Sequence, residues 1–216
     1  MKRFCARAAL LVGLCMGGTC AMAVEEAPYR VVQKAGSFEL REYESQILAE
    51  VVVDGDLEDA GNKAFNLLFR YISGENRGRA KIAMTAPVAQ ERTPQKIAMT
   101  APVGQQAAPG GWAVSFMMPS SYTLETLPVP DNPSVTIRQI PARRIAAIRY
   151  SGTWSGARYR DHLARLEAWI RASGFVPSGE PVWARYNPPF TPWFLRRNEV
   201  LIPVAPPKPE SAPAAP

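Results

Sequence analysis

Two stretches of this chain, 97 residues apart, carry the same order of sequence patterns. FELREYESQILAEVVVDGD at residues 38–56 aligns with VTIRQIPARRIAAIRYSGT at residues 135–153. In each stretch the apolar residues predict a strand, a short turn and a second strand that ends at a glycine; a helix and a further strand follow. The identical positions are few: Arg41/Arg138, Ala49/Ala146 and Gly55/Gly152. The prediction therefore depends on the shared order of the patterns. We therefore predict an α+β fold, a distorted β-barrel or curved mixed sheet of two similar β-β-α-β halves flanked by two helices.

Both helices have stop signals. Apolar residues recur at helical spacing over residues 57–72, and Gly74 follows as the expected end. A second helix is expected over residues 156–173, before Gly174. Strands are expected at residues 38–43, 47–53, 112–118, 135–140 and 145–150, whereas residues 104–111, rich in Gly and Gln, are interpreted as a linker.

The octapeptide KIAMTAPV occurs twice, at residues 81–88 and 96–103. In each copy the residues Ile, Met, Ala and Val alternate with Ala, Thr and Pro, which is the period of a strand. A solenoid would need more than two copies. We expect an antiparallel or neighbouring pair of strands, each ending at an edge or bulge because Pro87 and Pro102 cannot donate to a ladder.

The ends of the chain are expected to lie outside the fold. Residues 1–23 combine a basic start, an apolar run and the small-residue site Ala21-Met22-Ala23, which is typical of a secretory signal peptide; an N-terminal anchor is the alternative. Residues 205–216, rich in Pro and Ala, are expected to be a disordered tail. The folded domain is then 29–204.

Loss of the leader would change both cysteine content and charge. Cys5, Cys15 and Cys20 would leave with it, so the mature chain would have no disulfide or thiolate site. Three positive charges would also go, and the net charge would fall from +6 to +3. We therefore expect a periplasmic or secreted protein, a monomer with no nucleic-acid partner and no stable membrane insertion.

No catalytic constellation is visible in the sequence. His162 is the only histidine, there is no G-x-S-x-G motif, and phosphate-binding glycine loops are missing, so we expect no enzyme. His162 lies on the flank of the second helix's apolar stripe, either as a haem-iron ligand or as a half-exposed helix residue. In the segment 185–200, aromatic rings and prolines surround a charged RRNE, where Arg196 or Arg197 could pair with Glu199 to lock the last strand; the alternative is an aromatic lip facing a ligand.

The first helix offers more than one interface. Its apolar residues cover about 200° of the helix, beyond the roughly 100° that a one-sided surface helix needs. The surplus edge suits a flat apolar molecule with carboxylates; alternatively, loops or the other half of the chain cover it. The candidate ligand-binding residues are Lys63, Phe65, Leu68, Phe69, Arg70 and Ile72.

Several segments together resemble the SOUL haem-binding protein family. They are KIAMTAPV, Tyr71–Asn76, Arg149–Gly152 and YNPPFTPWFLRRNEV, and the likeness extends over about residues 29–204. The duplicated octapeptide is similar to that of bacterial-type, exported members. Haem or another tetrapyrrole, bound non-covalently in an apolar cleft beside the first helix for transport, buffering or sensing, is what the resemblance implies.

The same resemblance bears on individual residues. It places Arg70 where a basic side chain can meet a propionate. A histidine ligand has been proposed for some members, but this chain has none near its first helix, which leaves His162 or no protein ligand. The alternatives are an enzyme acting on a tetrapyrrole or a hydrophobic ester, and a binder of another apolar small molecule.

Overall fold

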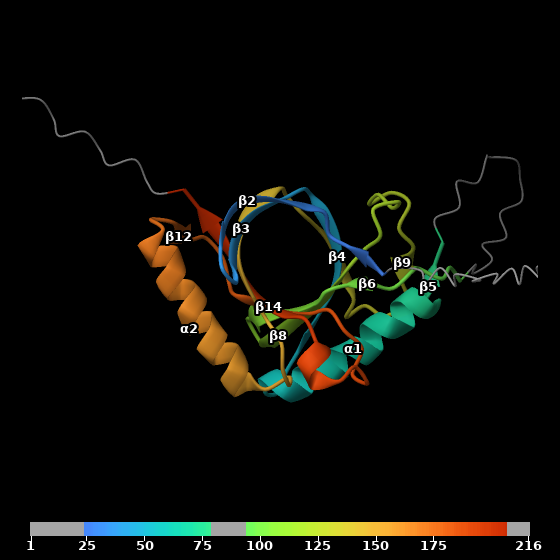
Figure 1. Ribbon diagram of the computed structural model, residues 1–216. Coiled ribbons are helices and arrows are strands. Elements are labelled where there is room, and N and C mark those ends of the chain that lie inside the picture. The colour runs from blue at the N-terminus through green and yellow to red at the C-terminus, as the bar shows by residue number, and fades with distance from the viewer. Residues whose placement is uncertain (1–23, 79–93, 207–216) are drawn as a thin grey trace, which may run out of the picture.

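The computed structural model describes residues 24–78 and 94–206 (Figure 1). The helices are α1 (Leu57–Ser73), α2 (Gly156–Ala172) and the short 3-10 helix η1 (Trp193–Leu195). The strands are β1 (Glu25–Glu26), β2 (Tyr29–Ala35), β3 (Phe38–Tyr43), β4 (Gln46–Val53), β5 (Asn76–Arg77), β6 (Thr100–Ala101), β7 (Val103–Ala108), β8 (Gly111–Met117), β9 (Val129–Pro130), β10 (Thr136–Ile140), β11 (Arg143–Tyr150), β12 (Val176–Pro177), β13 (Val182–Arg185) and β14 (Asn198–Ala205).

One large antiparallel sheet dominates the fold. Its strands follow the order β10-β4-β8-β7-β13-β14-β11-β3-β2, and β12 pairs with β14 beside this path. The order ends at β10 and β2, so the sheet curls round without closing into a barrel. Figure 1 looks into this curl and shows α1 and α2 outside it. The predicted α+β fold, a curved sheet with two flanking helices, is confirmed.

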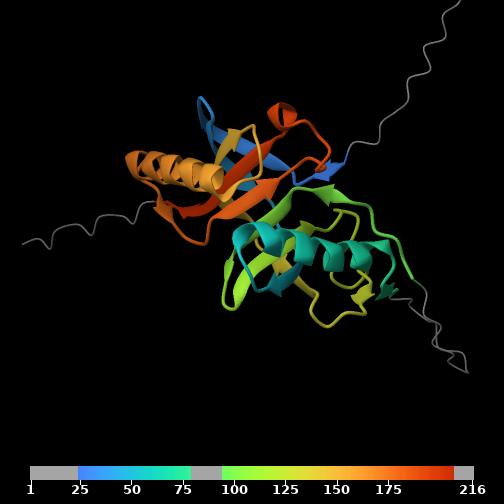
Figure 2. The same cartoon turned by 90° about the horizontal axis from the view of Figure 1, so that it is seen from below.

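The sheet has two lobes, each with its own helix (Figure 2). In the first lobe, α1 packs on β4 and β8, which lie beside β7 and β10; in the second, α2 packs on β11 and β14, which lie beside β13, β3 and β2. The two-residue turn Glu44–Ser45 joins β3 of the second lobe to β4 of the first. Pro141–Ala142 joins β10 of the first lobe to β11 of the second. Each lobe is therefore built from both halves of the sequence.

Local signals set the helix ends, and both predicted helices are confirmed to within one residue. The Asp56 carboxylate accepts hydrogen bonds from the backbone N–H groups of Glu58 and Asp59, at 3.0 and 2.9 Å, and so caps α1. At the other end Gly74 adopts a φ of 122°, a conformation that costs glycine little. Ser155 caps α2 in the same way as Asp56 caps α1.

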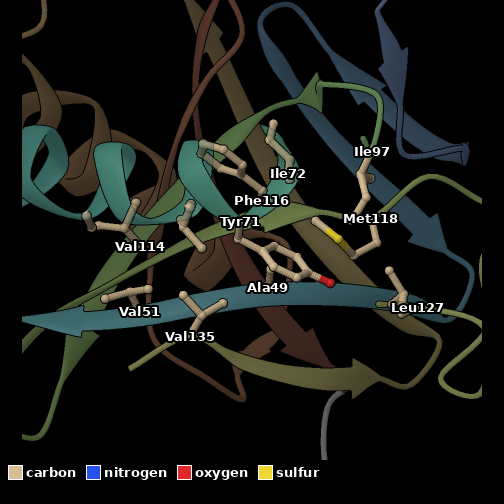
Figure 3. Packing of buried hydrophobic residues seen from close by; sticks show 12 residues of the cluster. Ala49, Val51, Tyr71, Ile72, Ile97, Val114, Phe116, Met118, Leu127 and Val135 are labelled. Carbon is tan, nitrogen blue, oxygen red and sulfur yellow. The ribbon is translucent and has the colours of Figure 1, made fainter. Parts of the chain in front are cut away.

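Three apolar clusters fill the fold. The largest lies between α1 and the first lobe, where Leu68 and Tyr71 pack on Val51, Val114 and Phe116 (Figure 3). A second lies between α2 and the second lobe and contains Trp183 and Leu166. The third faces the inside of the curl, with Met117, Ile145 and Leu201 among its members. Adjacent residues alternate between the outer clusters and the inner one, as the strand period requires.

A buried ion-pair network also lies on the inner face of the second lobe. Arg41 of β3 donates two hydrogen bonds to Glu199 of β14, at 2.7 and 3.0 Å. Tyr186 and Arg197 donate to the same carboxylate, at 2.8 and 3.0 Å. Of the two arginines predicted as alternative partners of Glu199, Arg197 makes the pair and Arg196 does not. Arg41 is a further partner that sequence spacing did not reveal.

Two sequence predictions need correction. The segment 104–111 is not a linker, since most of it belongs to β7, which pairs with β8 and β13. In the second octapeptide only Thr100–Ala101 and Val103 are in strands, and Thr100–Ala101 pairs in parallel with Glu25–Glu26. The first octapeptide lies outside the described residues, as do the expected leader and most of the expected tail, so the pairing of the two copies stays a prediction.

Two features are absent from the described ranges, 24–78 and 94–206. No helix there is long and apolar enough to cross a membrane. The same ranges hold no cluster of three or more His, Cys, Asp or Glu side chains that could bind a metal ion.

Candidate functional site

The inner face of α1 belongs to the core. Ala64, Leu68, Tyr71 and Ile72 are buried against the first lobe. Leu68 and Ile72, which the sequence placed in a ligand-binding set, therefore contact the sheet (Figure 3 shows Ile72 among the core residues). A contact of these two residues with a ligand stays a prediction.

One edge of α1 remains outside the core. Phe65 is half-buried and Phe69 is 49% exposed, and their rings stack at 5.9 Å between centroids with 11° between planes. Phe65 also meets the core residue Phe116 edge-on at 5.3 Å, which fixes the inner ring of the pair. The structure thus presents an ordered aromatic surface, with one ring anchored and one open to solvent.

The two predicted cations of α1 are exposed and paired. The Lys63 Nζ atom lies 3.9 Å from Asp54, and the Arg70 Nε atom donates to Glu75 at 2.6 Å. The hydrogen bond from Arg70 to Glu75 raises the pKa of this guanidinium. Surface pairs of this kind contribute little stability, so a ligand carboxylate could take the place of either acid.

Arg185 is a cation near this edge that sequence reasoning did not single out. It lies on β13, donates to the Gln105 amide oxygen at 3.1 Å, and its guanidinium covers the rings of Trp154 and Trp183 at 5.5 and 5.1 Å. Gly61 of α1 allows this approach, because a Cβ atom there would lie 2.6 Å from an Arg185 nitrogen. Gly61, Phe65 and Phe69 are four residues apart, so Arg185 lies at the N-terminal end of the same α1 edge.

Arg185 keeps one donor without an acceptor. Its Nε atom is buried and has no hydrogen-bond partner among the described residues. Within the described part of the chain no carboxylate pairs with Arg185, and burial lowers the pKa of its guanidinium to about 10. The guanidinium still carries its charge at neutral pH, so the cluster suits an incoming anion. The alternation of Val-Trp-Ala-Arg, which puts Trp183 and Arg185 on one face of a strand, was the available sequence signal.

An exposed apolar loop lies beside the same cluster. Phe190, Trp193, Phe194 and Leu195 are each more than half exposed. The loop is held by Arg196, whose guanidinium covers Trp154 at 4.4 Å, and by a hydrogen bond from the Gly152 N–H to the Trp193 carbonyl. Trp154 therefore contacts both Arg185 and Arg196 and links the loop to the α1 edge. These side chains are exposed, and the aromatic lip facing a ligand that the sequence suggested stays a prediction.

His162 lies elsewhere, between α2 and the second lobe. It is 8% exposed, and its ring stacks on Tyr150 at 3.8 Å between centroids. The Nδ1 atom lies 2.7 Å from the Arg158 carbonyl oxygen, to which it donates when that nitrogen is protonated. His162 is thus more buried than either sequence interpretation assumed, and the structure does not bring it together with the α1 residues.

Comparison with known families identifies the chain. A family model described as "SOUL heme-binding protein" matches residues 24–203. The chain belongs to the SOUL haem-binding protein family. Proteins named Heme-binding protein 1 are similar to this SOUL member along most of its length. That of Xenopus tropicalis is 26% identical over 165 residues, which are 76% of this chain and 82% of the relative. That of Mus musculus is 26% identical over 185 residues, or 83% and 92%.

Solved structures share the fold of this SOUL-family chain at lower identity. The crystal structure of the EcmrR C-terminal domain matches with a TM-score of 0.52 and 14% identity, over 82% of this chain and 98% of that one. A hydrolase from Listeria innocua matches with a TM-score of 0.51 and 12% identity, over 81% and 94%. At these identities the likeness concerns the fold alone.

Proposed function

We propose that this SOUL-family chain binds haem or a related tetrapyrrole, non-covalently, along the outer edge of α1. Family membership and the names of the relatives support the class of ligand. One arrangement supports this location. The stacked Phe65–Phe69 pair lies on the edge of α1 that Arg185 of β13 approaches, and the Arg185 Nε atom lacks an acceptor. Binding, rather than catalysis, is the proposed activity.

The residues of this edge fit the chemistry of a porphyrin. A porphyrin is a flat apolar ring with carboxylates on one side, so it needs an apolar surface and a nearby cation. Phe69 and the loop residues Phe190 and Phe194 offer the apolar contact. Arg185 offers a guanidinium fork, which pairs with carboxylates through two hydrogen bonds, and Arg70 and Lys63 offer exposed alternatives.

We propose that His162 does not ligate the haem iron. A porphyrin bonded to this imidazole would have to separate α2 from the sheet, because His162 is buried against Tyr150. Haem affinity is then expected to come from apolar contact and carboxylate pairing. When bound, haem would supply its own iron chemistry, and the residues of the α1 edge would hold and orient the ring.

The proposed role is transport, buffering or sensing of the tetrapyrrole outside the cytoplasm, by a monomer that contacts no nucleic acid. The leader-like residues 1–23 support export. Export predicts that the mature protein begins at Val24 and does not react with thiol reagents. Mass spectrometry of the exported protein tests this expectation, and a mature chain that retains Cys5, Cys15 or Cys20 would contradict it.

Titration of the protein with hemin, followed by the Soret absorption, tests the location. Phe69→Ala should weaken hemin binding by about tenfold, because it removes the exposed ring of the stacked pair. Its cost in stability should stay below the roughly 3–5 kcal/mol of a core Phe truncation. Val176→Ala, at a residue that is also about half exposed but lies in the second lobe, is the matched control and should leave hemin affinity unchanged.

Two further arms separate the contributions to binding. The dimethyl ester of hemin should bind more weakly than hemin, and Arg185→Gln should remove most of that difference, because the cation would no longer favour the carboxylates. His162→Ala should keep most of the affinity if the protein does not ligate the iron through this residue. Unchanged hemin affinity in both Phe69→Ala and Arg185→Gln would contradict the proposed site.

A further inference from the structure

A cavity of about 410 Å³ lies on the inner face of the curled sheet, away from both helices. Its walls come from strands of both lobes, and its apolar part includes Leu48, Met117, Ile145 and Leu201. The exposed residues Pro141 and Glu180 border it, so it is open to solvent. Figure 1 shows α1 and α2 outside the curl, so this cavity is separate from the α1 edge.

Two arginines line this cavity, and only one of them is paired. Arg138 of β10 donates to Glu50 at 2.6 Å. Arg143, at the start of β11, makes no ion pair or hydrogen bond with the described residues. Burial, followed by the nearby charge of Arg138, lowers the pKa of Arg143. Glu180 is the carboxylate among the lining residues, and it is exposed. The half-buried charge of Arg143 therefore has no ion-pair partner in the cavity.

Buried donors in the same cavity also lack acceptors. The Gln46 Nε2 and Arg138 Nε atoms are both buried without a hydrogen-bond partner. A buried polar group left in this state is destabilising relative to one that is hydrogen-bonded. Both atoms are donors, and the adjacent guanidinium of Arg143 is a donor as well. Besides Glu50, which takes one hydrogen bond from Arg138, a single further acceptor with negative charge could serve all three donors.

We infer that the inner cavity binds a small apolar carboxylic acid, with its carboxylate between Arg143, Arg138 and Gln46 and its hydrocarbon against Leu48, Met117 and Leu201. A carboxylate has the acceptor atoms that the three side chains need and neutralises the unpaired charge of Arg143. The apolar wall stabilises the hydrocarbon by removing its surface from water. This site is independent of the α1 edge and does not depend on haem binding.

Decanoate is a suitable probe, and 1-decanol is its uncharged match. Isothermal titration should show saturable decanoate binding and at least tenfold weaker binding of decanol. Arg143→Met should weaken decanoate binding at least tenfold and bring it close to that of decanol. Arg143→Lys, which keeps the charge but not the fork, should lose less. Arg144→Met, at the exposed neighbour that does not line this cavity, is the matched control and should change affinity less than twofold.

The neighbouring residues Met117 and Met118 report the location. Met117 lines the cavity, whereas Met118 is buried in the cluster under α1. With ¹³C-labelled methionine methyl groups, decanoate should shift the Met117 signal and leave that of Met118 in place. Hemin at saturation should not displace decanoate.

Three results would each overturn the inference: no saturable binding of decanoate, equal affinity for decanoate and decanol in the unmodified protein, or a response at Met118 without one at Met117. The first two need no variant, so the test holds even if Arg143→Met fails to fold. Failure of these arms leaves the hemin titrations at the α1 edge unaffected, so the two proposals can fail separately.

Discussion

Glu199 is the residue on which the inner face of the second lobe depends. It is fully buried and accepts hydrogen bonds from Arg41, Tyr186 and Arg197. Burial alone would raise the pKa of this carboxyl, but the hydrogen bonds and charges of Arg41, together with the charge of Arg197, hold it below its ordinary value. Removing one partner of a buried pair is costly because the other charge remains in the interior.

Glu199→Gln should therefore lower the free energy of unfolding by about 3 kcal/mol at pH 7. A group whose folded pKa is depressed contributes stability above its unfolded pKa, about 4.3 for Glu, and loses that contribution as pH falls through the folded value. The stability difference between the two proteins should hold above about pH 5 and narrow at more acid pH. Urea unfolding at a series of pH values measures it.

The matched control is Glu42→Gln. Glu42 pairs with Arg30 and Arg144 at the surface, where ion pairs contribute little. This variant should change stability far less than Glu199→Gln does. Equal effects of the two substitutions, or a difference for Glu199 that does not vary with pH, would show that the buried network is not the cause.

For individual side chains, the sequence indicated ion-pair partners that are close in the chain and missed those that are distant. Glu199 was expected to pair with Arg196 or Arg197, both close to it in the sequence, and Arg197 makes the pair. Arg41 lies 158 residues from Glu199, and nothing local marks that contact. The same holds for Arg185, whose position beside α1 depends on Gly61, and for Arg143, whose lack of a partner is a property of the assembled sheet.

Among the secondary-structure elements, those with strong periodicity were predicted well. The helix α1 was expected at residues 57–72 because its apolar spacing and Gly74 agree, and both signals are local. By contrast, β7 reads VGQQAA and has a single β-branched residue, Val103, of the kind that marks strands. It forms because β8 and β13 pair with it on both sides, and Gln105 is tolerated inside because its amide donates to the Leu57 carbonyl at 2.6 Å.

The wide apolar arc of α1 correctly indicated more than one environment for its side chains. The residues divide between core and surface differently from the prediction. Leu68 and Ile72 belong to the interface with the sheet, whereas Phe69 is open to solvent and Phe65 lies between the two. Helical periodicity gives the relative directions of side chains, but not the angle at which the helix rests on its sheet. That angle depends on Phe116 and Val114 of β8, which meet α1 from a distant part of the chain.

For the whole molecule, the duplicated pattern predicts two similar halves but not how they interlock. Strand β4 of the first half pairs with β10 of the second, and β3 pairs with β11. Both pairings cross between the sequence halves, as does the Arg41–Glu199 contact. The core under α2 likewise needs Leu40 from the first half. Neither half of the sequence contains a complete lobe.

This arrangement predicts that the halves cannot fold separately. A fragment of residues 24–133 would leave one edge of β3 and one edge of β4 unpaired, since only β2 and β8 would remain beside them. A fragment of residues 134–206 would leave β10 without a strand partner and β11 with β14 alone. Open sheet edges and an uncovered apolar face cost stability and favour aggregation. Each fragment alone should show no cooperative urea transition, whereas the mixture should recover one together with the circular dichroism of the intact chain. A cooperative transition for residues 24–133 alone would mean that the first lobe is stable without β10, and that the crossed pairings do not hold the fold together.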